Sequence, residues 1–427
     1  MTLTLVFVVL IALAALRVPV GLAMFAAGVA GTFWIGGDRA GLLISSTVTG
    51  MLSGYVLAAM AFALLLTGLA RASGLSRHGF IGWRAMGRPN SGGGLALAML
   101  SLIVGASAGD SLDRNTAVAV RDRLDAAGYR QSSIIGVLFG AAGMRFVVPV
   151  SAIVVFAGTL VEQSITQLML ALVIPAGTLA VILLIVAGLS EFYRRAQMPE
   201  AQTPPADRGS IGYAFAGVFV SLFLILLVTL LIAWGLATPT EAFGLAALIM
   251  LIYAVIVAAT GGAGFRDLFQ GLVFSARKFG DISLILLGAL LIARAAALSG
   301  NTQALAGATE NNLFIVMAVM LVGLVVCAAL LGALPALALS SVVIFPTMMG
   351  GGIDATLAVV LLLAAATLGQ AIPGIGRTNS FIRQCFDDVT LGQITRAALP
   401  YFIATAVWLA VVIQALPMIL FFVKSLR

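Results

Sequence analysis

The sequence predicts an all-α integral membrane protein: an inverted-repeat bundle of about ten transmembrane helices with two re-entrant hairpins. The composition, the length of the apolar runs and a pair of matching interruptions in the two halves predict this fold class. Of the 427 residues, 62% are hydrophobic and 9% are charged, whereas soluble domains have about 25% charged residues. Several apolar runs reach about 18 residues, the length of a membrane-spanning helix. This composition excludes a soluble globular protein.

The positive charges set the expected topology. The chain has 23 Lys and Arg and a net charge of +7, and such residues collect in the cytoplasmic loops of membrane proteins. Most of them fall into six groups, which we assign to the cytoplasm: Arg17; Arg71, Arg77, Arg84 and Arg88; Arg121, Arg123 and Arg130; Arg194, Arg195 and Arg208; Arg266, Arg277 and Lys278; Arg377, Arg383 and Arg396.

About ten apolar segments are then expected to cross the membrane in alternation. They are residues 3–16, 18–35, 47–70, 132–160, 168–190, 211–234, 241–260, 282–298, 357–383 and 397–423. No basic residue precedes the first segment, so we expect a retained helix and not a cleaved signal sequence.

Two further apolar segments are predicted to enter and leave the membrane on the same face. Residues 92–120 have basic groups on both sides, and their middle, Gly105-Ala106-Ser107-Ala108-Gly109-Asp110-Ser111, is rich in helix-breaking small residues. Residues 313–349 are too long for one crossing, and Gly332 and Pro335 interrupt them. We expect the first hairpin to enter from the cytoplasm and the second from outside.

Each half of the chain repeats the same order, a hairpin followed by a broken helix. Pro149 and Pro373 each interrupt an apolar span about 40 residues after the hairpin tip. We therefore divide the chain into a first repeat (1–190, broken helix 132–160), a cytoplasmic linker (191–210) and a second repeat (211–427, broken helix 357–383). Inverted repeats place a binding site near the bilayer midplane, where the broken helices meet.

Residues 264–280 are predicted to form an amphipathic helix on the cytoplasmic membrane surface. One face carries the apolar residues Phe265, Leu268, Phe269, Leu272, Ala276 and Phe279. Two roles are open for this helix, bracing a moving domain or forming a surface helix without that role.

Several short stretches, at matching spacing over nearly the whole chain, resemble one family. They are Arg17-Val18-Pro19-Val20-Gly21, Gly105 through Ala126-Ala127-Gly128-Tyr129, Ala237-Thr238-Pro239-Thr240-Glu241-Ala242, Gly352-Ile353-Asp354, the Pro373–Gly376 interruption and Ala398-Leu399-Pro400-Tyr401. Together they resemble the large membrane subunit of tripartite ATP-independent periplasmic (TRAP) transporters, the DctM-like family.

The resemblance implies a fold like that of elevator-type anion/sodium symporters and a function. The chain would be the large permease subunit of a secondary active, sodium-coupled transporter that imports a small organic acid, a carboxylate. Its partners would be a small four-helix membrane subunit and a periplasmic solute-binding protein. The expected location is the bacterial inner membrane, in which the chain is multi-pass.

Sodium is a hard cation that prefers oxygen ligands, and interrupted helices offer backbone carbonyls and hydroxyls. The expected sodium ligands are Ser107, Gly109, Ser111 and Ser151 in the first half and Gly332, Pro335, Gly374, Gly376 and Thr378 in the second. The alternative is that these small residues only allow close helix packing. Na⁺ is the coupling ion expected, with no other cofactor or metal.

Arg145 lies four residues before Pro149, inside an apolar span, where the related family has a small residue. A buried Arg needs a partner. The substrate carboxylate would be that partner, with hydrogen bonds from Ser151, Asn379 and Ser380. The alternative partners are Asp110 and Asp113, in which case Arg145 is structural. Arg294 is expected to form a structural pair or to contact the small subunit.

No enzymatic activity is expected. Gly105-Ala106-Ser107-Ala108-Gly109 matches a nucleophile-elbow pattern, but a serine nucleophile needs a base. His78, the only histidine, lies in a basic loop and is expected to be solvated. The sequence has no nucleotide-binding motif, and Cys327 and Cys385 suggest neither a disulfide framework nor a structural metal site.

Two alternatives to the tripartite transporter stay open. A stand-alone sodium/anion symporter of the related divalent-anion family would have the same repeats, although the 237–242 stretch argues against it. A non-transporting membrane scaffold would not need the interruptions, which cost stability.

Overall fold

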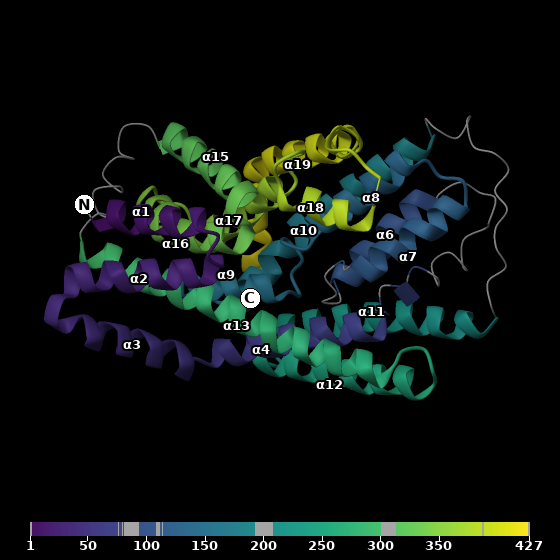
Figure 1. Ribbon diagram of the computed structural model, residues 1–427, viewed down its shortest axis with the longest axis horizontal. Coiled ribbons are helices and arrows are strands. Elements are labelled where there is room, and N and C mark those ends of the chain that lie inside the picture. The colour runs from purple at the N-terminus through teal and green to yellow at the C-terminus, as the bar shows by residue number, and fades with distance from the viewer. Residues whose placement is uncertain are drawn as a thin grey trace.

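The computed structural model describes residues 2–75, 77–78, 80, 94–107, 112, 114–192, 208–299, 313–386 and 388–425, and its regular structure in these ranges is helical (Figure 1). The helices are α1 (Thr2–Ala15), α2 (Val20–Gly36), the 3₁₀ turn η1 (Gly37–Arg39), α3 (Ala40–Ser53), α4 (Tyr55–Ser73), α6 (Gly94–Ser107), α7 (Arg114–Ala126), α8 (Gln131–Met144), α9 (Ala152–Leu160), α10 (Ile165–Phe192), α11 (Arg208–Ala233), α12 (Pro239–Ala259), α13 (Phe265–Leu298), α15 (Leu313–Leu331), α16 (Ala333–Gly350), α17 (Ala355–Gln370), α18 (Arg377–Cys385) and α19 (Leu391–Ser425).

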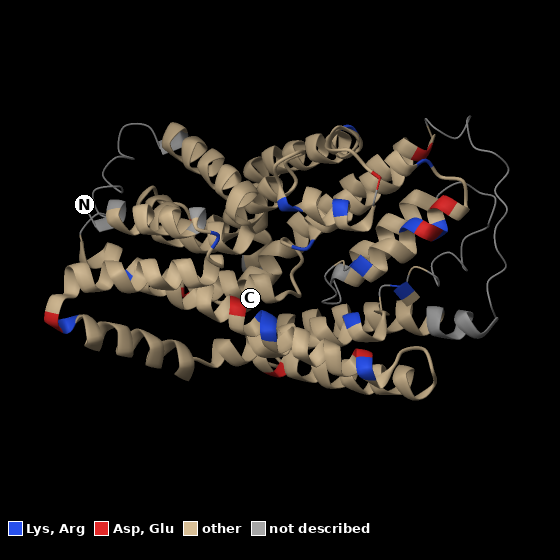
Figure 2. Cartoon of the chain, viewed as in Figure 1, with Lys and Arg blue, Asp and Glu red and all other residues tan. Residues whose placement is uncertain are grey.

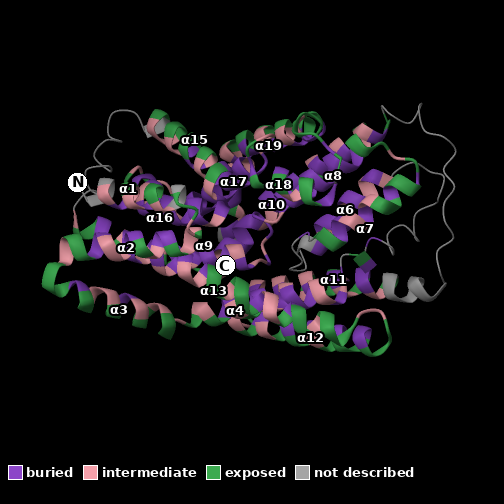
Figure 3. Ribbon diagram, viewed as in Figure 1, coloured by how far each residue is buried: buried purple, intermediate pink, exposed green. Residues whose placement is uncertain are grey.

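The outside of the molecule is apolar, as a membrane protein requires. Large hydrophobic side chains such as Phe219, Val319 and Leu330 are 65–70% exposed, and charged residues are sparse on the helices (Figures 2 and 3). Water would not wet such a surface, whereas lipid would. The predicted class, an all-α membrane protein, is confirmed.

Eight helical segments of the described chain are long and apolar enough to cross a membrane. The sequence predicted about ten crossings. The two predicted broken helices, 132–160 and 357–383, are each split into two shorter helices, whereas α10 and α19 continue through their internal prolines. Helix α1 has only 14 residues. At 1.5 Å per residue, α1 is about 21 Å long, shorter than the hydrocarbon core of about 30 Å.

Helix α13 is the centre of one tightly packed group with α2, α4 and α12. Gly68 on α4 and Gly271 on α13 touch backbone to backbone, since a Cβ added at Gly271 would lie 2.5 Å from the Gly68 carbonyl oxygen. At the same crossing, Ser275 Oγ donates to the Leu64 carbonyl at 3.0 Å. Small residues at membrane helix crossings allow this close approach. α3, α4, α11, α12 and α13 lie along the lower part of Figure 1.

Two boundaries differ from the prediction. Residues 264–280 are not a separate amphipathic helix but the first half of α13. This helix has 34 residues and continues past Gly280 to Leu298. Phe265 and Phe269 are exposed on it, as expected for residues of the predicted apolar face. The predicted span 47–70 is interrupted at Gly54, whose extended backbone (ψ 126°) separates α3 from α4.

Both predicted hairpins contain two helices. α6 and α7 form the first, and the second arm runs to Ala126, past the predicted end at residue 120; residues 108–111 and 113 lie outside the described part. α15 and α16 form the second, and Gly332 separates them with φ of +102°. The two pairs lie toward opposite ends of the long axis in Figure 1. The division into inverted repeats and linker stays a prediction.

A buried carboxylate fixes the start of the first hairpin. Glu191, near the end of α10, accepts hydrogen bonds from the backbone N–H groups of Gly94 and Leu95 at 3.1 and 3.2 Å. The Tyr129 hydroxyl donates to the same carboxylate at 2.9 Å. A negative charge at a helix N-terminus is stabilising, so this contact anchors α6 to α10.

Candidate functional site

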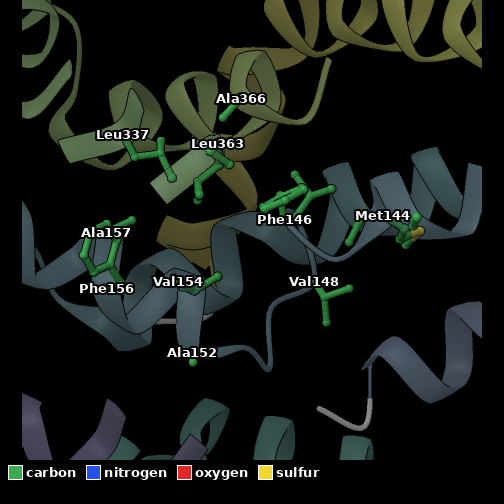
Figure 4. Close-up of a cluster of buried hydrophobic side chains, with 14 of the residues drawn as sticks. Met144, Phe146, Val148, Ala152, Val154, Phe156, Ala157, Leu337, Leu363 and Ala366 are labelled. Carbon is green, nitrogen blue, oxygen red and sulfur yellow. The ribbon is translucent and has the colours of Figure 1, made fainter. Parts of the chain in front are cut away.

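The first interruption separates α8 from α9. Helix α8 ends at Met144, and α9 begins at Ala152 with Ser151 as its N-cap, whose hydroxyl accepts from the Val154 N–H at 3.4 Å. Apolar side chains on both sides of this break are buried. Figure 4 shows them beside Leu337, Leu363 and Ala366 of α16 and α17, so the core joins the first break to elements of the second half.

The second interruption, residues 371–376, separates α17 from α18 and is held by Asn379. The Asn379 side-chain N–H groups donate to the carbonyl oxygens of Ile372 and Gly376 at 2.9 and 2.8 Å, and its Oδ1 accepts from Gly374 N at 3.1 Å. Gly374 has φ of +91°, a conformation that favours glycine. The polar groups of Asn379 are therefore engaged by the loop, and its contact with the substrate stays a prediction.

The tip of the second hairpin meets this loop. Gln370, fully buried at the end of α17, donates to the Ala328 carbonyl oxygen in the last turn of α15. Arg377 Nη1 donates to the Leu331 carbonyl at 3.4 Å. Pro335 lies in the first turn of α16 and not in the break, and the hairpin residues in contact with Arg377 are Leu331 and Gly332.

Arg145 lies at the C-terminus of α8. Its guanidinium carbon is 4.7 Å from the centre of the Phe146 ring. Its Nε is buried and has no hydrogen-bond partner among the described residues. The positive charge of Arg377 is close enough to repel the Arg145 guanidinium group. The sequence grouped Arg377 with the cytoplasmic cations, and the structure places it at this junction, a location that the sequence did not predict.

Thr378 is the second side chain here with an unused polar atom. It is 1% exposed, and its Oγ1 has no partner among the described residues. A buried hydroxyl without a partner costs free energy, and this atom is suited to ligate a hard cation. The hydroxyl of Ser380, by contrast, is exposed and donates to the Arg377 carbonyl at 2.7 Å.

The remaining predicted site residues belong to the first hairpin. Ser107 is the last residue of α6, and its side chain lies outside the described part. Gly109 and Ser111, with the alternative partners Asp110 and Asp113, also lie outside the described residues. Arg294, on α13, donates to the Thr47 hydroxyl at 3.3 Å, a structural contact with α3.

Two arginines on α7 clamp the end of α18, which the sequence did not reveal. Arg114 Nε donates to the Gln384 carbonyl at 2.8 Å, and Arg121 Nη1 donates to the Cys385 carbonyl. The Arg121 guanidinium also lies 5.5 Å from the Phe386 ring centre. Cations at a helix C-terminus are stabilising, so this clamp joins an arm of the first hairpin to the second broken helix.

The prediction for His78 was wrong, because the residue is buried and not solvated. Its side chain is 5% exposed, and Nδ1 lies 3.3 Å from the Tyr253 hydroxyl on α12. Burial lowers the pKa of His78 to about 4, with a further contribution from the positive charge of Arg77. The imidazole is therefore neutral at pH 7 and serves packing.

An apolar exterior with two interrupted helices that meet in the interior is the architecture of a secondary membrane transporter. The family follows from comparison with known proteins. A family model described as the DctM component of the tripartite ATP-independent periplasmic transporter matches residues 7–419, so the chain belongs to this family. The family consists of transporter components, which confirms the resemblance and the expectation that the chain is not an enzyme.

A relative identified by its sequence agrees with this assignment. The chain is 25% identical over 296 residues to the C4-dicarboxylate TRAP transporter large permease protein DctM of Pseudomonas aeruginosa, a match that covers 67% of this chain and 66% of that relative. In fold it is similar to the crystal structure of the Alcanivorax borkumensis YdaH transporter, with a TM-score of 0.66, 14% identity and 90% coverage of each chain. At that identity the likeness shows the fold alone.

Proposed function

We propose that the chain is the large permease of a sodium-coupled TRAP transporter that imports a small organic acid across the bacterial inner membrane. A periplasmic binding protein delivers the acid, and a separate small four-helix membrane subunit completes the complex. The observation that carries the proposal is that Arg145, at the end of α8, and Thr378, on α18, each have a buried polar atom without a partner among the described residues, and that α8 packs on α18.

The chemistry of these groups supports binding of a carboxylate and of a sodium ion. A guanidinium group binds carboxylates through charge and paired hydrogen bonds. Sodium needs oxygen ligands, which Thr378 Oγ1, Ser151 Oγ and the carbonyl groups near Gly332, Gly374 and Gly376 could supply. The name of the Pseudomonas relative refers to C4-dicarboxylates, which makes dicarboxylates the first substrates to test.

The packing supports an elevator motion. Helices α2, α4, α12 and α13 pack closely with one another, as do α8, α10, α15, α16, α17 and α19, while fewer contacts join the two groups. Close backbone contact at Gly68 and Gly271 makes the first group suited to be a rigid scaffold. The second group holds both interruptions and would be the part that moves.

Reconstitution tests the tripartite arrangement. The chain would be placed in proteoliposomes with its candidate small subunit and binding protein, and uptake of labelled organic acids would be measured with each protein omitted in turn. Uptake that needs all three proteins is the expected result. Uptake by this chain alone would instead support a stand-alone symporter.

A further inference from the structure

The guanidinium group of Arg377 lies where the second interruption meets the second hairpin. Arg377 is the first residue of α18, directly after the loop 371–376. A Cβ added at Gly332 would lie 2.6 Å from Arg377 Nη1, so the guanidinium group lies directly against the hairpin tip. Its hydrogen bond to the Leu331 carbonyl holds it there.

The first interruption adds a second positive charge to the same place. Helix α8, which ends beside Arg145, packs on α18, and the positive charge of Arg377 acts on the Arg145 guanidinium. In the part of the chain that the structure describes, neither guanidinium group pairs with a carboxylate. Arg145 is partly buried and Arg377 is exposed, and an anion between two like charges lowers their repulsion.

We infer that Arg377 is a second substrate-binding cation, and that Arg145 and Arg377 together hold one carboxylate group of the transported acid. The inference rests on the proposed function and adds to it the residue that completes the site. The bound carboxylate joins α8 of the first half to α18 of the second. The hairpin tip at Gly332 covers one side of it.

Anion-dependent stability of the purified full-length chain tests this site without knowledge of the natural substrate. Thermal unfolding in detergent would be followed with acetate, lactate, succinate and the uncharged analogue succinamide. We expect at least one carboxylate to raise the unfolding temperature of the wild type and succinamide to have no effect. Arg145→Gln and Arg377→Gln should each weaken the apparent carboxylate affinity about ten-fold or more.

Two controls separate this site from a structural role of Arg145. Arg383→Gln, an exposed position on the same helix, should keep the wild-type response. Without an anion, Arg145→Gln and Arg377→Gln should unfold at the wild-type temperature or above it, because a repulsion is removed. Arg145→Gln could instead unfold at a lower temperature than the wild type without an anion. If Asp110→Asn or Asp113→Asn lowers the unfolding temperature in the same way, Arg145 forms an internal ion pair and the inference is overturned.

Uptake measurements distinguish failure of this inference from failure of the proposed function. If Arg377→Gln takes up the acid with an unchanged half-saturating concentration, the inference is wrong and the proposed function stands. If carboxylates stabilise the chain through both arginines but no sodium-driven uptake occurs, the site stands and the proposed function is wrong. No carboxylate response in the wild type would overturn the inference.

Discussion

The side-chain amide of Asn379 donates a hydrogen bond to the Gly376 carbonyl oxygen at 2.8 Å, within the interruption between α17 and α18. Two more hydrogen bonds join the same side chain to Ile372 and Gly374. The loop thus keeps one shape because a buried side chain satisfies its backbone groups, together with the backbone hydrogen bond from Gly376 N–H to the Ile372 carbonyl at 2.9 Å.

Replacing Asn379 with Ala should destabilise the protein. The change removes the partner of the Gly374 N–H and one of the two hydrogen bonds at each of the Ile372 and Gly376 carbonyls, at a cost of about 1–3 kcal/mol. Thermal unfolding in detergent measures the loss. Ser380→Ala, next along the helix and exposed, should stay within about 0.5 kcal/mol of the wild type. Equal effects of the two variants would show that Asn379 does not hold the loop.

Thr378→Val should weaken sodium dependence without loss of stability. The Thr378 hydroxyl is buried and has no protein partner among the described residues, so its removal breaks no hydrogen bond. If it ligates sodium, the half-saturating sodium concentration for uptake should rise several-fold, and Thr378→Ser should restore it. A Val variant with wild-type sodium dependence would remove Thr378 from the ion site.

Gly271→Ala should disrupt the scaffold. The added methyl group would meet the Gly68 carbonyl oxygen at 2.5 Å and the Ala72 Cβ at 2.7 Å, and such overpacking costs about 1–3 kcal/mol. Gly280→Ala, on the same helix but with open space around it, should instead add up to about 1 kcal/mol through helix propensity. The unfolding temperatures of the two variants should move in opposite directions.

The buried His78 should make stability depend on pH. Its folded pKa of about 4 lies below the unfolded value of 6.5, so the unfolded chain binds more protons between these values. The contribution of His78 to the free energy of unfolding is therefore fully present above pH 6.5. It should fall by up to about 3 kcal/mol as the pH drops to 4. Unfolding temperatures of the wild type and His78→Gln over this pH range test it, because the variant should lose that part of the slope.

The sequence predicted the features that have strong local signals. Pro149 and Pro373 cannot donate a helical hydrogen bond, and each lies in a real interruption, whereas Pro175 and Pro400 lie within continuous helices. The hairpin break at Gly332 was visible for a similar reason, since a run of apolar residues too long for one crossing had to turn at a glycine.

Other features depend on tertiary contacts that no local pattern records. Gly54 interrupts a span and Gly280 does not, although both are single glycines. Arg377 was grouped with loop cations because its charge fits that pattern, and only packing against Gly332 reveals its place. His78 was predicted to be solvated from its basic neighbours, whereas Tyr253, distant in sequence, covers it.

The most direct test of the central claim is uptake of a labelled organic acid into proteoliposomes that contain all three proteins, with an inward sodium gradient. We expect accumulation that stops when a sodium ionophore collapses the gradient and that Thr378→Val shifts to higher sodium concentrations. Accumulation that persists without sodium, driven by a proton gradient or by none, would contradict the sodium site and the coupling proposed for this chain.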